Sequence, residues 1–65
     1  MNFIKSYCES INDKCYDLEI ALNLDNILYI YELTNDTIMV VLINGDQLNL
    51  HLKYRTILTT INSTK

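Results

Sequence analysis

The pair Asn44-Gly45 places the firmest constraint on how this chain can fold. These two residue types tolerate the positive φ angles that a tight β-hairpin turn requires. The segment before the pair, residues 37–43 (TIMVVLI), is apolar on both faces, as in a strand that is covered on two sides. The segment after it, residues 47–53 (QLNLHLK), alternates between apolar and polar side chains. The two segments therefore predict an antiparallel hairpin inside a larger sheet.

Length and composition predict a single small domain over residues 1–65. A domain of this size buries only about 60% of the surface that its unfolded chain exposes. The hydrophobic fraction is nevertheless 49%, with one glycine and no proline, which excludes a disordered chain. We therefore expect part of the apolar surface to be buried against another chain.

The N-terminal segment predicts a helix over about residues 2–12. Its apolar side chains recur at helical spacing: Phe3, Ile4, Tyr7, Cys8 and Ile11. Residues 16–24 alternate like a strand, but they also extend a heptad pattern from the first segment. We favour the strand, because a continued helix would place Tyr16, Ile20 and Leu24 on its acidic face. The long helix remains open as an alternative.

The predicted fold is therefore mainly β, with an N-terminal helix followed by five antiparallel strands in meander order. Bending such a sheet into a small barrel would reduce its exposed edges. The threonine-rich and β-branched segment YRTILTTI is taken as the last strand. The strands are expected at about 16–24, 27–33, 37–43, 47–53 and 54–61.

Charge and cysteine usage narrow the class of protein. The net charge is −3, and the acidic excess lies in the first half of the chain. Cys8 and Cys15 match no zinc or redox spacing, so we expect them to fill apolar space in a reducing, cytoplasmic compartment. The longest apolar run, IMVVLI, is too short to span a bilayer, and no membrane segment is predicted.

No pattern in the sequence indicates an enzyme, a cofactor or a metal site. Gly45 is the only glycine, so a glycine-rich phosphate loop is impossible. His51 has no cysteine or carboxylate at metal-binding spacing and is interpreted as a surface histidine. Asp17 and Glu19 share a strand face, but no further group converges on them for acid–base chemistry.

The predicted order of elements resembles the Sm-like fold, whose bacterial member is Hfq. The last strand of that family carries Tyr-Lys-His followed by small, aliphatic and hydroxyl residues. Residues 54–61 place a tyrosine, a base, an aliphatic residue and hydroxyls in the same phase, with Thr56 in place of the histidine. Residues 35–44 (NDTIMVVLIN) are similar to the family's aspartate before an apolar strand that ends in asparagine, with Asp36 and Asn44 at the matching places.

The resemblance implies a ring-forming homo-oligomer, a hexamer or heptamer, that binds uridine-rich single-stranded RNA and serves as a post-transcriptional regulator. The site residues that it implies are Lys53, Tyr54, Arg55 and Thr56. Arginine can bond phosphates or base edges, and an aromatic ring can stack on a base.

Two other interpretations stay open beside this one. The chain could be a small acidic protein-interaction or inhibitor protein from a phage or other mobile element, without RNA binding. It could also be a structural domain that only oligomerises.

Overall fold

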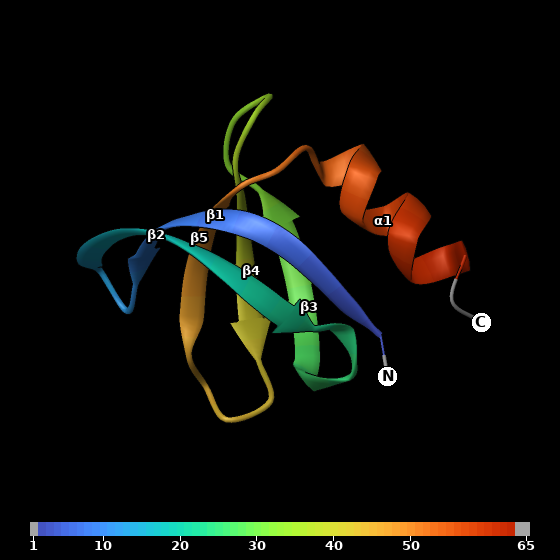
Figure 1. Ribbon diagram of the computed structural model, residues 1–65, viewed down its shortest axis with the longest axis horizontal. Helices are drawn as coiled ribbons and strands as arrows, with labels where there is room; N and C mark the ends of the chain where they lie inside the picture. The colour runs from blue at the N-terminus through green and yellow to red at the C-terminus, as the bar shows by residue number, and fades with distance from the viewer. Residues whose placement is uncertain (1, 64–65) are drawn as a thin grey trace.

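The computed structural model describes residues 2–63 as five antiparallel strands followed by one C-terminal helix (Figure 1). Of the predicted domain 1–65, Met1, Thr64 and Lys65 lie outside the described residues. The elements are β1 (Phe3–Ile11), β2 (Lys14–Asn23), the 3-10 turn η1 (Leu24–Asn26), β3 (Ile27–Glu32), β4 (Ile38–Leu42), β5 (Gln47–His51) and α1 (Tyr54–Ser63).

The sheet curls but does not close into the predicted barrel. Its strand order is β2-β1-β5-β4-β3, so β2 and β3 are consecutive in the chain yet form opposite edges. The short η1 connects these edges and is fixed at both ends. Leu24 N–H donates to the Asn2 carbonyl, and Ile43 N–H donates to the Asn26 carbonyl, each at 2.8 Å. In Figure 1, β1 and β2 cross in front of the other three strands.

The predicted helix over residues 2–12 is wrong, because this segment forms β1. Ile4, Ser6 and Cys8 alternate toward the interior, as in any half-buried strand. A register shift between Cys8 and Ser10 then inserts one residue, so that Cys8 and Ile11 pair with the buried Leu50 and Leu48. The bulge therefore produces the three-residue spacing that resembled a helix.

The predicted strand over residues 54–61 is also wrong, because this segment forms α1. Ile57 is fully buried in the core, and Tyr54 and Ile61 pack against the same cluster. Their spacing of three and four residues places them on one helical face, and Arg55, Thr56 and Leu58 lie outside it, exposed. Tertiary burial thus outweighs the β-propensity of the threonine and isoleucine residues.

The four interior segments of the prediction are confirmed as strands. β2, β3, β4 and β5 correspond to the expected segments 16–24, 27–33, 37–43 and 47–53, with the ends moved by up to two residues. The alternative of a helix over residues 15–24 is therefore wrong. The described residues therefore form a mainly β protein with five strands, and its helix lies at the C-terminal end.

Two tight turns set the registers of the sheet. Gly45 has a φ of 95°, and the Asn44 side-chain oxygen accepts a hydrogen bond from Asp46 N–H at 3.0 Å, which confirms the predicted hairpin. The β1–β2 hairpin turns at Asn12 and Asp13, whose φ angles are 51° and 69°. Asparagine and aspartate adopt this left-handed region at lower cost than most residues.

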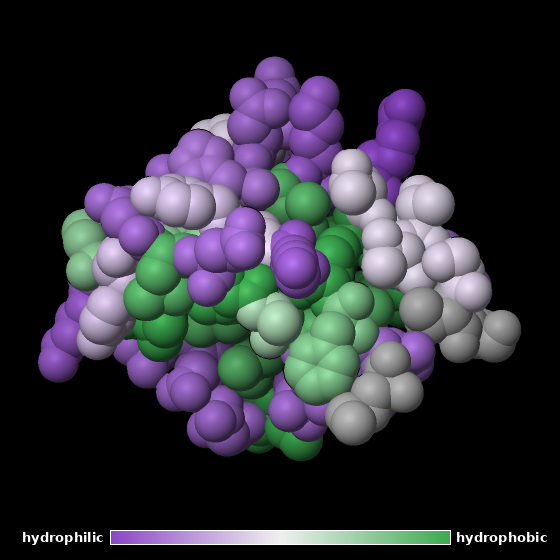
Figure 2. Space-filling view, in the orientation of Figure 1, coloured by the Kyte–Doolittle hydropathy of each residue, from purple (hydrophilic) through white to green (hydrophobic). Residues whose placement is uncertain are grey.

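The core lies between the concave face of the sheet and α1. Its buried members are Cys8, Leu22, Ile38, Val40, Leu48, Leu50 and Ile57. The central strands β4 and β5 supply most of them, through the pairs Ile38–Leu50 and Val40–Leu48. Figure 2 shows that hydrophobic side chains also reach the surface between polar ones on the face that carries β1 and β2.

Replacement of Ile57 tests the position of α1. We expect Ile57→Ala to lower the free energy of unfolding by about 2–5 kcal/mol, because it removes a fully buried side chain and leaves a cavity. The adjacent Leu58→Ala should cost less than about 1 kcal/mol, since Leu58 is exposed. Urea unfolding followed by circular dichroism measures both values. Equal losses would contradict the burial of Ile57 in the core.

Candidate functional site

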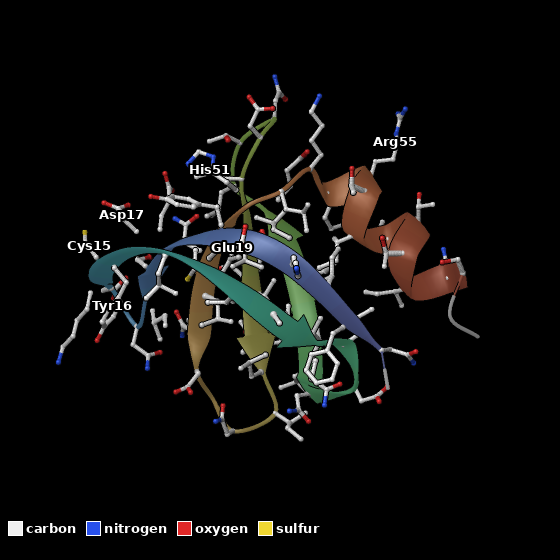
Figure 3. The ribbon with its side chains drawn as sticks, in the orientation of Figure 1. Cys15, Tyr16, Asp17, Glu19, His51 and Arg55 are labelled. Carbon is white, nitrogen blue, oxygen red and sulfur yellow. The ribbon has the colours of Figure 1, made fainter. Side chains whose placement is uncertain are left out.

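The β1–β2 hairpin carries an acidic surface that is interleaved with large apolar side chains. Its exposed carboxylates are those of Asp13 in the turn and of Asp17 and Glu19 on β2. Tyr7, Tyr16 and Leu18 lie on the same two strands and are 45%, 48% and 38% exposed. Figure 3 shows Tyr16 and Asp17 projecting from the end of the hairpin, with Glu19 further along β2. Leu18 pairs with the buried Cys8 and Glu19 with the exposed Tyr7, so these side chains project from both faces of the hairpin. We call these six residues together the acidic hairpin surface.

Hydrogen bonds from Asn12 hold the acidic hairpin surface against the rest of the sheet. Asn12 N–H donates to the Gln47 carbonyl at 2.8 Å, and its side-chain oxygen accepts from Gln47 N–H at 2.9 Å. The side-chain amide of Asn12 also donates to Asp46 at 3.1 Å. One asparagine thus joins the turn of the first hairpin to the start of β5, which orders the tip of the hairpin.

A backbone irregularity in β2 displays the side chains of this surface. Asp17 has a φ of 48°, and the pairing with β1 shifts between Leu18 and Cys15. Such a bulge leaves residues unpaired and turns the strand locally. It occurs where Tyr16 and Asp17 are exposed.

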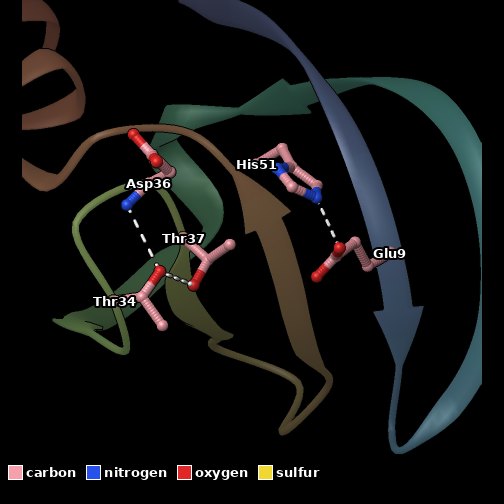
Figure 4. A network of polar contacts seen from close by, with 5 residues as sticks. All are labelled: Glu9, Thr34, Asp36, Thr37 and His51. Carbon is pink, nitrogen blue, oxygen red and sulfur yellow. Dashed lines mark hydrogen bonds and ion pairs between the residues drawn. The ribbon is translucent and has the colours of Figure 1, made fainter.

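At the edge of the acidic hairpin surface, β1 and β5 bring Glu9 and His51 beside Tyr7. Tyr7 and His51 are direct cross-strand partners, with ring centroids 5.9 Å apart. His51 Nε2 contacts the Glu9 carboxylate, as the dashed line in Figure 4 shows. The two side chains are 45% and 39% exposed, so the pair contributes less than about 1 kcal/mol of stability.

The exposed position of His51 confirms its interpretation as a surface residue. Its partner Glu9 was missed, because the sequence analysis placed Glu9 on a helix. The alternation of Lys5, Tyr7 and Glu9 with smaller side chains is the signal that could have revealed this face.

The four residues implied by the Sm-like resemblance lie together at the start of α1. Lys53, Arg55 and Thr56 are exposed, and Figure 3 shows Arg55 pointing away from the body of the protein. Tyr54 is half-buried and packs against the core, which leaves less of its ring available for stacking. This segment belongs to a helix and cannot supply a last strand.

Asp36 is confirmed as a turn residue between β3 and β4. Its N–H donates to the Thr34 hydroxyl at 3.2 Å, and the hydroxyls of Thr34 and Thr37 lie 2.8 Å apart (Figure 4). The hydrogen bond from Asp36 N–H is local, so Asp36 helps to fix the turn that precedes β4.

The two cysteines have different environments. Cys8 is fully buried in the core, as expected of an apolar filler, whereas Cys15 is exposed on the hairpin, which the prediction had wrong. Burial raises the pKa of the Cys8 thiol, and the nearby Glu9 carboxylate adds to the rise.

A shallow hollow is lined by Asn26, Leu42, Ile43 and Asn44, and none of these side chains titrates. The described residues contain no group of three or more side chains placed to hold a metal ion. No helix in residues 2–63 has the length and apolarity needed to cross a membrane.

Comparisons of the chain with protein-family models, with curated proteins and with solved structures give no match.

The buried Cys8 thiol generates a prediction about alkaline pH. In the unfolded chain this thiol ionises near its ordinary pKa of about 9, whereas the folded protein retains the proton to higher pH. The folded state then binds more protons than the unfolded state, so stability falls as pH rises above about 9. We expect Cys8→Ala, despite a lower stability at pH 7, to lose less stability between about pH 7 and pH 10.

Urea unfolding at a series of pH values measures this difference. Cys15→Ala is the matched control, because the Cys15 thiol is exposed, and it should follow the wild type. A Cys8→Ala profile parallel to that of the wild type would contradict the burial of the thiol.

Proposed function

We propose that this protein is a small acidic interaction protein that binds a cationic partner protein through the acidic hairpin surface. The observation that supports the proposal is the mixture of exposed carboxylates with Tyr7, Tyr16 and Leu18 on one ordered hairpin. Protein interfaces combine apolar and aromatic anchors, which lose their water, with charges that select the partner. The acidic hairpin surface contains both kinds of group.

The charges make a basic partner the complementary one. The net charge of the chain is −3, and Lys5 and Lys14 are the two cations in β1 and β2. The field of the hairpin would accelerate encounter with a cationic protein and repel polyanions. The aromatic rings would then supply most of the binding energy after contact.

Site-specific photo-crosslinking tests this proposal. A benzophenone amino acid in place of Tyr16 should form a discrete adduct with one protein in an extract of the source cell. The same group in place of the exposed Thr59 on α1 is the matched control and should give no such adduct. The adduct should resist ribonuclease, weaken as salt rises and disappear with Asp17→Lys, because the partner is recognised by charge.

An adduct that ribonuclease removes, or one that forms equally from position 59, would contradict the proposal. So would an adduct that survives Asp17→Lys unchanged.

Binding of uridine-rich single-stranded RNA is a second candidate function. It is supported by the exposure of Lys53 and Arg55 at the start of α1, in a part of the sequence that has no acid after Asp46. Contacts from these cations to phosphates would add to the resemblance to Sm-like proteins. The hexameric or heptameric ring belongs to this candidate.

Titration of a fluorescent oligouridine separates the two candidates. The RNA candidate predicts binding that falls steeply with salt and weakens about tenfold in Arg55→Ala, because one phosphate contact is lost. Lys14→Ala removes a cation from the distant hairpin and should have no effect. Our primary proposal instead expects no oligouridine binding by the wild type at physiological salt.

A further inference from the structure

The two edges of the sheet differ in how well they resist pairing with another strand. β2 carries Lys14, Asp17 and Glu19, and its bulge at Asp17 interrupts the regular backbone. Charged side chains and bulges are the devices that protect an edge strand. The sequence of β3 is ILYIYE, which has a single charge at its end. The edge formed by β3 therefore lacks the protection that β2 possesses.

The side chains along β3 are unusually exposed for their size. Tyr29 is 53% exposed, Tyr31 43% and Leu33, just beyond the strand, 42%. The rings of Tyr29 and Tyr31 stack with their centroids 6.2 Å apart, so they form one ordered apolar surface. Tyr29 pairs with Val41 and Tyr31 pairs with Met39. This pairing places both tyrosine side chains on the face of the sheet opposite the core.

The backbone of β3 has hydrogen-bonding groups directed away from the sheet. Leu33 N–H donates to the Thr37 carbonyl at 3.1 Å, which fixes the phase of the ladder with β4. Because the pattern repeats every two residues, Tyr31 bonds to β4 while the N–H and carbonyl groups of Ile30 and Glu32 point outward. A second strand in antiparallel orientation could bond all of these outward groups.

We propose that two copies of this chain dimerise by antiparallel pairing of their β3 edges about a twofold axis at Tyr31. In this register each Ile30 bonds to Glu32 of the second copy, each Tyr29 faces Leu33 of the second copy, and the two Tyr31 side chains meet at the axis. No carboxylate directly faces another, and four backbone hydrogen bonds form from groups that are otherwise solvated.

A second copy fits this edge better than the alternatives. Pairing of β3 with β2 of another copy would build an open chain or a ring, but it would meet the bulge and carboxylates of β2. Pairing of β2 with itself would meet the bulge at Asp17 in both copies. The β3 dimer joins the less charged edges and leaves both acidic hairpin surfaces at the outer ends of a continuous sheet. The inference goes beyond the proposed function and does not depend on it.

Native mass measurement and sedimentation test the dimer directly. At protein concentrations up to about 1 mM, where even a weak interface is occupied, the wild type should approach twice the 7.6 kDa of one chain. Tyr31→Arg should raise the dimer dissociation constant about tenfold or more, because it places two like charges at the axis. Tyr16→Arg is the matched control, a similarly exposed tyrosine on the other edge, and should dimerise normally.

Disulfide trapping tests the register, with Cys15→Ser as the background. Tyr31→Cys should oxidise readily to a covalent dimer, since residues facing each other in a non-hydrogen-bonded pair have Cβ atoms about 4.5–5.5 Å apart. Tyr29→Cys should oxidise at least about tenfold more slowly, because Tyr29 faces Leu33 of the second copy and its own counterpart lies far along the strand. Circular dichroism confirms that each variant is folded.

A monomeric wild type at the highest concentration would overturn the proposal. A hexamer or heptamer that both arginine variants dissociate would overturn it in favour of a β2–β3 ring. Equal trapping at positions 29 and 31 would overturn the register. None of these results bears on the photo-crosslinking from Tyr16, so failure of the dimer and failure of the proposed function can be distinguished.

Discussion

The pairing of β1 with β5 is the interaction on which the rest of the structure depends. It joins the N-terminal hairpin to the β3–β4–β5 meander, and it sets β2 and β3 as the two edges of the sheet. Asn12 secures the junction through its hydrogen bonds to Gln47. Because this pairing links segments far apart in the sequence, its loss would separate the β1–β2 hairpin from the three-stranded meander, and an isolated hairpin has little stability in water. The curled sheet and the site for α1 both follow from it.

An open sheet must satisfy the backbone groups of its edges with water or with another chain. In this protein the two edge strands carry different side chains, so they differ in how readily another strand can pair with them. The charges and the bulge of β2 keep its backbone solvated and display the acidic hairpin surface. The apolar β3 presents Tyr29 and Tyr31 beside unpaired main-chain groups. Charge-directed binding at one edge and self-association at the other can thus occur without competing.

The four strands from β2 to β5 could be predicted from sequence, because the alternation of side chains and the turn residues agree there, as at Asn44 and Gly45. At the two ends of the chain, the predicted helix is a strand and the predicted strand is a helix, and both errors have a physical reason. The bulge in β1 gives Cys8 and Ile11 a helical spacing, and the burial of Ile57 makes a helix of a segment with strand-forming residues. For the candidate site, the sequence alone reveals the excess of acidic residues in the first half of the chain. The contact between Glu9 and His51 was not, because it depends on β1 being a strand beside β5.

Amide hydrogen exchange, followed residue by residue by nuclear magnetic resonance, tests most directly the claim that β3 is the edge open to pairing. Within the described residues 2–63, the ladder with β4 leaves the N–H groups of Ile30 and Glu32 directed outward, so their exchange reports on a partner strand. We expect these two amides to become protected as protein concentration rises, while the amides of the bulge around Asp17 continue to exchange quickly. Fast exchange of Ile30 and Glu32 at every concentration, or protection that appears first in β2, would contradict it.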